Sequence, residues 1–158
     1  MDSIADIECT SKSMIIGIFD NEFVKCELDD SLPVLIHRWK SELPGEEFKY
    51  NLRRVLEEYI NLKKSYSKLA WLADTVKLGE LEEDVEEWLV KTWEDLLFKK
   101  AEVKIHAVIL GQSIFADYPM EKFKTDSEIK FKELNVHLGV FSNQKEAYQW
   151  ITQKQLNA

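Results

Sequence analysis

The sequence has few of the residues from which metal and redox sites are built. It contains two cysteines, Cys9 and Cys26, and they do not form a Cys-x-x-Cys pair. Because structural zinc sites and thiol redox motifs need closely spaced cysteines, the sequence predicts neither kind of site. We therefore expect two ordinary thiols in a reducing compartment and no bound metal.

Glycine is scarce, and no apolar run is long. The five glycines do not form the Gly-x-x-x-x-Gly-Lys-Ser/Thr pattern that wraps a phosphate, so no nucleotide cofactor is expected. No apolar stretch approaches the roughly 20 residues of a membrane-spanning helix. Residues 1–13 lack the basic start and apolar core of a secretory signal, and we expect them to form a flexible leader. These absences predict a cytoplasmic protein without an integral membrane segment.

The chain also lacks an excess of positive charge. It carries 21 Lys and Arg residues against 29 Asp and Glu residues, a net charge of -8. An acidic domain repels phosphate backbones, and the basic residues do not cluster, so nucleic-acid binding is not expected. Hydrophobic residues, in contrast, make up 45% of the chain and include five tryptophans. This composition excludes a disordered chain and, with the length, predicts one domain over residues 14–158.

The order of the apolar patterns predicts an α/β fold. Short β-prone runs bounded by polar breaks predict strands at 14–19, 23–28, 33–39, 69–73, 103–110 and 136–141. Apolar residues at helical spacing and capping patterns predict helices over about 44–60, 81–100, 125–134 and from 143 onward. Strands separated by helices imply parallel pairs with right-handed crossovers. We therefore expect a mixed β-sheet in which an antiparallel N-terminal meander leads into a β-α-β-α-β-α-β-α run.

The candidate site lies at the carboxyl end of a predicted central strand. In open α/β sheets, ligands collect beyond the carboxyl ends of the parallel strands. Asp74 and Thr75 follow the apolar run 69–73, and Gly79 precedes the next helix. This arrangement predicts a regulatory or contact loop over 74–79, which also contains Lys77. Ordinary turn chemistry is the alternative, because Asp bonds its own backbone in turns and glycine permits a sharp bend.

The three histidines do not predict catalysis or metal binding. His37, His106 and His137 all fall inside predicted strands, and no two have the spacing of metal ligands. We expect each to be a half-buried strand residue. Nucleophilic catalysis needs a nucleophile beside a base, and no histidine lies at a strand end where Asp74 or Ser113 could use it. The sequence therefore predicts a protein that is not an enzyme.

Two tryptophans in the second helix are predicted to have different environments. Trp88 and Trp93 are five residues apart, about 140° around an α-helix, so they cannot share one face. Trp88 falls on the apolar stripe and is the expected core residue. Trp93, together with Leu97, is then a candidate partner-facing residue. A wider buried stripe that includes Trp93 is the alternative.

Two segments resemble a known family. The sequences WLADTVKLG (71–79) and VFSNQKEAYQWI (140–151) are similar to those of the STAS-like family, the fold of the bacterial anti-sigma-factor antagonists, and more narrowly to small bacterial STAS/CRAL-TRIO-like proteins. The resemblance runs from about Leu35 to Ile151. It implies a non-catalytic signalling module, without a cofactor, that binds a protein partner or a second copy.

The resemblance also implies a role for the predicted loop. In the antagonists, a serine or threonine after an aspartate is phosphorylated at the turn following a central strand, and Asp74 and Thr75 fall at that turn. The usual family pattern is Asp-Ser/Thr-Ser/Thr-Gly. Here Val76 replaces the second hydroxyl residue, and the glycine is displaced to position 79.

The lipid-transfer relatives of this fold imply an alternative function. A binder of a small apolar ligand or lipid would hold it in a pocket at the carboxyl edge of the sheet. Phe115, Tyr118 and Phe123, with Met120, form an aromatic-rich irregular segment that would then act as a lid. A simpler interpretation is that these side chains cap the edge of the sheet.

Overall fold

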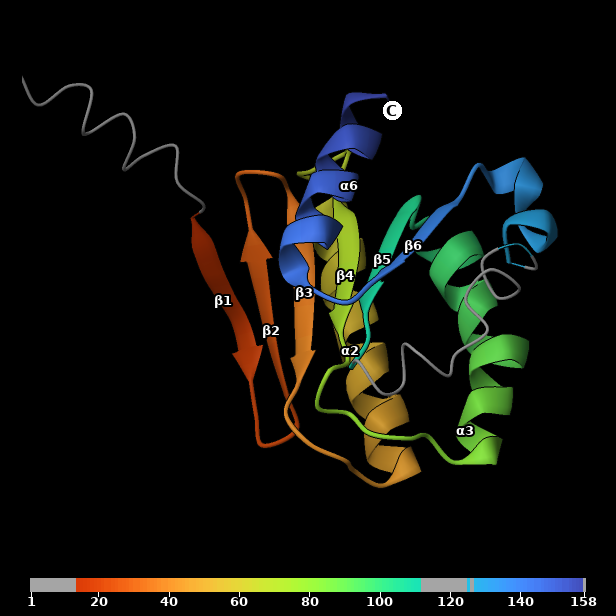
Figure 1. The fold of residues 1–158 in the computed structure, drawn as a ribbon. Coiled ribbons are helices and arrows are strands. Elements are labelled where there is room, and N and C mark those ends of the chain that lie inside the picture. The colour runs from red at the N-terminus through yellow and green to blue at the C-terminus, as the bar shows by residue number, and fades with distance from the viewer. Residues whose placement is uncertain (1–13, 112–124, 126, 158) are drawn as a thin grey trace, which may run out of the picture.

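A six-stranded mixed sheet forms the centre of the protein. The structure is a computed structural model and describes residues 14–111, 125 and 127–157. The strands lie in chain order across the sheet. They are β1 (Ile15–Asp20), β2 (Val24–Asp29), β3 (Val34–Trp39), β4 (Ala70–Asp74), β5 (Ile105–Ile109) and β6 (His137–Phe141). β1, β2 and β3 pair antiparallel, and β3 to β6 pair parallel (Figure 1). The predicted mixed α/β sheet with an antiparallel start is confirmed.

Helices cover both faces of the sheet. The helical segments include α2 (Gly45–Lys63), α3 (Glu83–Trp88), two π-helical segments that continue α3 (Leu89–Trp93 and Leu96–Lys100), a 3₁₀ turn (Lys132–Leu134) and α6 (Gln144–Leu156). α6 lies on one face, and α2 and α3 lie on the other (Figure 1). The predicted cap of α6 is present, because the Asn143 side chain accepts a hydrogen bond from the Glu146 N–H.

Alternate residues of the central strands supply two separate cores. Leu35 and Trp71 belong to the core beneath α2 and α3, whereas Ile36 and Leu72 belong to the core beneath α6. A strand covered on both faces has no polar side to show to water, which explains why β3 and β4 read as nearly continuous apolar runs. The evenly apolar segment 69–73 is therefore a central strand, as its sequence predicts.

Trp71 is the centre of the core beneath α2 and α3. Its ring lies 4.7 Å from His37 and 6.4 Å from His106, measured between ring centroids, so it contacts both neighbouring strands. It also lies 5.6 Å from Tyr59 of α2 and 5.9 Å from Trp93 of the π-helical continuation of α3. One side chain thus links three strands and both helices of this face.

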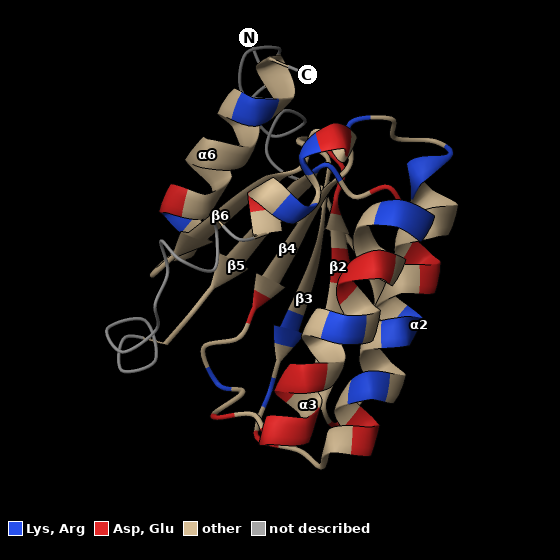
Figure 2. Cartoon of the chain, turned by 90° about the vertical axis from the view of Figure 1, so that its right-hand side faces the viewer, with Lys and Arg blue, Asp and Glu red and all other residues tan. Residues whose placement is uncertain are grey.

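The charges of α3 and its continuation are sorted by end. Glu83, Asp84 and Glu86 occupy the first turn, and Lys99 and Lys100 occupy the last. Figure 2 shows the acidic residues gathered at the beginning of α3. The acidic residues lie at the amino end, which has a partial positive charge, and the lysines lie at the carboxyl end, which has a partial negative charge. Both placements stabilise the helix.

Within the described part of the chain, none of the helices combines the length and the apolar composition needed to cross a membrane.

We expect Trp71→Ala to lower the free energy of unfolding by about 3–5 kcal/mol, because it leaves a cavity at the junction of three strands and two helices. Urea denaturation followed by far-ultraviolet circular dichroism measures this change. Tyr50→Ala is the matched control, since Tyr50 is an aromatic residue that is 66% exposed. Equal losses in the two variants would contradict the central role of Trp71.

Candidate functional site

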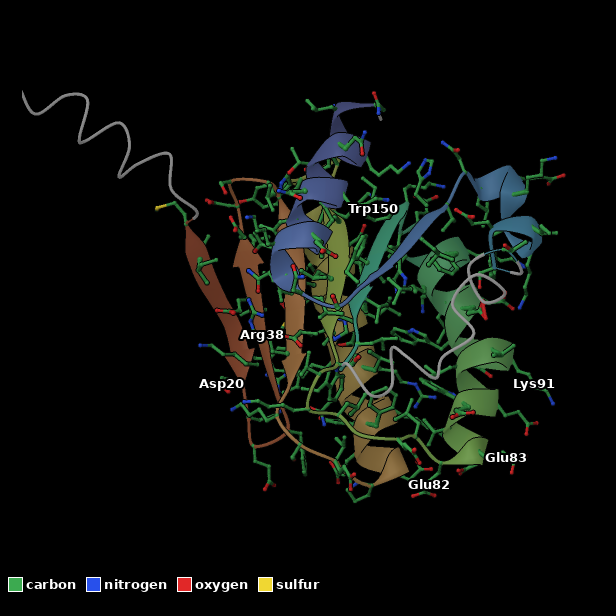
Figure 3. The ribbon with its side chains drawn as sticks, viewed as in Figure 1. Asp20, Arg38, Glu82, Glu83, Lys91 and Trp150 are labelled. Carbon is green, nitrogen blue, oxygen red and sulfur yellow. The ribbon has the colours of Figure 1, made fainter. Side chains whose placement is uncertain are left out.

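The carboxyl end of β4 is fixed to β3 by an ion pair. Asp74 and Arg38 are register partners on neighbouring parallel strands, and the Asp74 Oδ2 to Arg38 Nη1 distance is 3.0 Å. Arg38 Nε also donates to Glu27 on β2, at 3.1 Å. Figure 3 shows Arg38 on the side of the sheet nearer β1. The sequence analysis missed this partner of Asp74, although a lone arginine in an apolar strand is itself a sign that an acidic neighbour exists.

Thr75 fixes the loop to β5, the strand on the other side of β4. Its backbone N–H and its hydroxyl both donate to the Ile109 carbonyl of β5, at 2.9 Å and 2.7 Å. The Asp74 carboxylate in addition accepts the Val76 N–H at 3.2 Å, which is the Asx turn that the alternative interpretation predicts. Asp74 and Thr75 thus hold the beginning of the loop to β3 and β5.

The far end of the loop is fixed by packing and by backbone conformation. Leu78 is buried in the core beneath α2 and α3. Gly79 has a φ of 77°, a left-handed conformation that only glycine adopts without cost. A Cβ at Gly79 would lie 2.5 Å from Cγ of Glu42, because the Glu42 side chain packs directly against the glycine. Glycine at this position is required by the bend.

Two side chains project from this fixed loop. Val76 is 47% exposed, and Lys77 is also exposed. A Cβ at Gly111, two residues after β5, would lie 3.2 Å from the Val76 carbonyl oxygen, so the segment after β5 packs closely against the loop. The structure therefore brings Asp74, Thr75, Lys77 and Gly79 together in one ordered loop, but it exposes Val76 and Lys77 rather than Thr75 as the protruding groups.

The strand order does not favour a ligand crevice at the carboxyl ends of the parallel strands. In open α/β sheets the crevice forms where the strand order reverses and successive helices leave to opposite faces. The order of the six described strands never reverses. The helices α2 and α3 that connect β3, β4 and β5 consequently lie on the same face. The loop 74–79 is thus a surface feature of the edge and not one wall of a switch-point crevice.

The predicted environments of Trp88 and Trp93 are reversed. Trp93 is 5% exposed and contacts Trp71, whereas Trp88 is half-buried. Leu97 is buried as well. The interpretation of Trp93 and Leu97 as partner-facing residues is therefore wrong, and the alternative of a wider buried stripe is correct.

A change of helix type explains this reversal. Residues 89–93 form a π-helix, and the Glu94 N–H donates to the Leu89 carbonyl, five residues earlier. In this hydrogen-bond pattern, residues five apart lie one turn apart and not 140° apart. The Trp88 and Trp93 rings accordingly stack, with a centroid distance of 5.7 Å and an interplanar angle of 26°. No periodicity in the sequence indicated the π-helix.

Two histidines are buried more deeply than predicted. His37 is 2% exposed and His106 is 8% exposed, whereas His137 is half-buried, as expected. The Trp39 Nε1–H donates to His37 Nδ1 at 2.9 Å, which places the imidazole proton on Nε2. Burial lowers the pKa of both buried imidazoles to about 3, with a further contribution at His37 from His106. Both rings are therefore neutral core groups that pack against Trp71.

A cavity of about 420 Å³ lies away from the predicted site. Its lining consists of Lys99 and the residues from Ile129 to Leu134. These residues precede β5 and β6, so the cavity is at the amino ends of the strands and contains several lysines. The predicted lid residues Phe115, Tyr118 and Phe123 lie outside the described residues. The apolar pocket at the carboxyl edge stays a prediction.

Among the residues with described positions, His, Cys, Asp and Glu side chains do not gather into any group of three that would hold a metal ion.

We expect Gly79→Ala to destabilise the protein by about 1–2 kcal/mol, because alanine resists the left-handed conformation and its Cβ meets Glu42. The double variant Gly79→Ala with Glu42→Ala removes the steric contact and retains the backbone cost. Chemical denaturation of the single and double variants separates the two contributions. A Gly79→Ala variant as stable as the wild type would contradict the observed loop conformation.

The buried histidines predict a loss of stability in mild acid. In the folded state the pKa of each is about 3, well below the ordinary value of 6.5. Below pH 6.5 the histidines of the unfolded chain therefore bind protons that those of the folded chain do not. The histidine contribution to stability is full well above pH 6.5 and falls as the pH decreases towards 3, by about 1.4 kcal/mol per histidine between pH 7.5 and 5.5. Urea denaturation at each pH, with His106→Phe as the comparison, measures this slope. A His106→Phe variant with the wild-type slope would exclude the contribution of His106.

Comparisons with known proteins give no relative: no family model matches the chain, no curated protein is significantly similar in sequence, and no solved structure is a significant match to the fold.

Proposed function

We propose that this chain is a non-catalytic, STAS-like interaction module that binds a protein partner through the loop 74–79. The observation that carries this proposal is the combination of a fixed backbone and two protruding side chains. The loop is held by Arg38, by the Ile109 carbonyl and by the buried Leu78, while Val76 and Lys77 face solvent. A loop that is ordered before binding loses little conformational entropy in the complex, which favours affinity.

The chemistry of the protruding pair indicates the kind of partner. Val76 offers an exposed β-branched apolar side chain, and Lys77 offers a mobile positive charge. A small apolar depression with an acidic group beside it would complement this pair. Lys77 is also a positive group on a chain whose net charge is -8, so it would direct an acidic partner to this position.

Thr75 acts in this proposal as an anchor of the loop. Its hydroxyl donates to the Ile109 carbonyl at 2.7 Å, and a phosphoryl group on Oγ1 would remove that donor. Phosphorylation would also add roughly 1.5 to 2 negative charges beside Asp74. Modification of Thr75 would consequently detach the loop from β5 and reduce partner binding by disordering Val76 and Lys77. This is the regulatory counterpart of the proposed interaction.

We expect Val76→Asp to abolish partner capture while leaving the fold intact, because an exposed carboxylate replaces the apolar contact. Immobilised wild-type protein and variants are incubated in parallel with lysate of the source organism, and bound proteins are quantified by mass spectrometry. Tyr50→Asp, which changes an exposed residue on α2, is the control and should retain the partner.

The same experiment tests the anchor. Thr75→Val removes the hydroxyl donor and should weaken capture, and Thr75→Glu should weaken it further because it adds charge. If no protein captured by the wild type is lost with Val76→Asp, the loop is not the binding surface. If Thr75→Glu captures the partner as well as the wild type does, regulation through Thr75 is excluded.

A further inference from the structure

The edge strand β1 is largely apolar, and among the residues that the structure describes only β2 pairs with it. It pairs with β2 on one side and forms one edge of the sheet (Figure 1). Met14, Ile15 and Ile16 are 54%, 47% and 42% exposed. Residues 14–19 contain no charged residue and no proline. Natural proteins protect edge strands with charged residues or proline, because open backbone groups otherwise pair with another strand. Residues 14–19 lack this protection.

The hydrogen bonds of β1 show which backbone groups are free. The Asp30 N–H donates to the Met14 carbonyl, so the backbone of Met14 faces the inside of the sheet. Along an antiparallel strand this direction alternates from residue to residue. The N–H and C=O groups of Ile15 and Gly17 therefore point away from β2, towards the open side. A register shift between Gly17 and Phe19 ends this regular stretch.

We propose that β1 is a homodimer interface, in which two copies pair their β1 strands antiparallel about a two-fold axis at Ile16. This register pairs Ile15 with Gly17 of the partner copy, and Gly17 with Ile15, so that all the outward backbone groups of this stretch are hydrogen bonded. Ile16 faces Ile16 of the partner copy as a pair that does not exchange hydrogen bonds. The two six-stranded sheets become one continuous sheet.

The shape of the strand favours a second copy over an unrelated strand. Ile15 and Gly17 lie on the same face of the sheet as their register partners on β2, Asp29 and Glu27. A Cβ at Gly17 would meet no atom within 4 Å, so there is open space above this glycine. In the proposed register, the exposed Ile15 side chain of each copy covers the open Gly17 of the other. The contact between Ile15 and Gly17 therefore occurs twice, once on each side of the axis, as a two-fold interface requires.

The charge distribution favours the same contact. Two chains of net charge -8 repel each other over most of their surface, and the uncharged stretch 14–19 is where their sheets can meet. Asp20, the acidic residue at the end of β1, is paired with Lys40, which lowers the pKa of the carboxyl group and neutralises its charge at this edge. The interface is also remote from the loop 74–79 on β4, which stays free in the dimer.

The first test is the mass of the full chain in solution. Sedimentation velocity over a range of concentrations should give a dimer, twice the 18.6 kDa of one chain. Ile16→Lys places two positive charges face to face and should raise the dimer dissociation constant about tenfold or more. Val90→Lys changes an exposed β-branched residue on the π-helical continuation of α3 and should leave the constant unchanged. A monomer at all concentrations would overturn the proposal, and so would an Ile16→Lys variant that dimerises like the wild type.

The second test fixes the register by disulfide formation. In a Cys9→Ser background, the remaining Cys26 is buried and does not compete. The cysteines introduced by Ile16→Cys would face each other with Cα atoms about 4.5 Å apart, within the range for a disulfide. Those introduced by Met14→Cys would be offset by four residues, about 13 Å along the strand. We expect rapid crosslinking of the Ile16→Cys variant alone under mild oxidation. Equal crosslinking of both variants would indicate random collision and overturn the register.

Discussion

The packing around Trp71 is the interaction on which the rest of the structure depends. The side chain lies on the central strand β4 and contacts a histidine on each neighbouring strand, Tyr59 of α2 and Trp93 of the π-helical continuation of α3. Two of these neighbours are histidines, and both are held neutral because they are buried. The core beneath α2 and α3 therefore depends on pH through the same contacts that join its strands and helices.

The fixed position of β4 determines the position of the loop that follows it. Because β4 lies between β3 and β5, the residues at its carboxyl end find partners on both sides, Arg38 for Asp74 and the Ile109 carbonyl for Thr75. The loop is consequently ordered at its beginning by polar contacts and at its end by Leu78 and Gly79. The side edge of the sheet at β1 has a different character, since within the described part of the chain β1 retains unpaired backbone groups and exposed apolar side chains. The proposed partner site is thus an ordered loop, whereas the proposed dimer interface is an open strand.

The sequence by itself determined the elements and their order. Alternation and helical spacing are local properties, so the three N-terminal strands, the central strand 69–73 and the long helices could be predicted from neighbouring residues. The Asn143 cap and the charges at the two ends of α3 and its continuation are local too. The turn chemistry of Asp74 and the need for glycine at position 79 were also visible, because they involve residues close in sequence.

Only the tertiary structure decided which side chains face one another. Arg38 lies 36 residues from Asp74, so no local pattern could identify it as the partner. The π-helix that stacks Trp88 on Trp93 widens the helix within the core beneath α2 and α3, and its hydrogen-bond pattern leaves no periodic signal in the sequence. Whether Val76 or Thr75 protrudes depended on a carbonyl of β5, and the open side of β1 depended on its place at the edge of the sheet. Contacts between distant segments are fixed by the packing of the whole sheet, which local sequence does not contain.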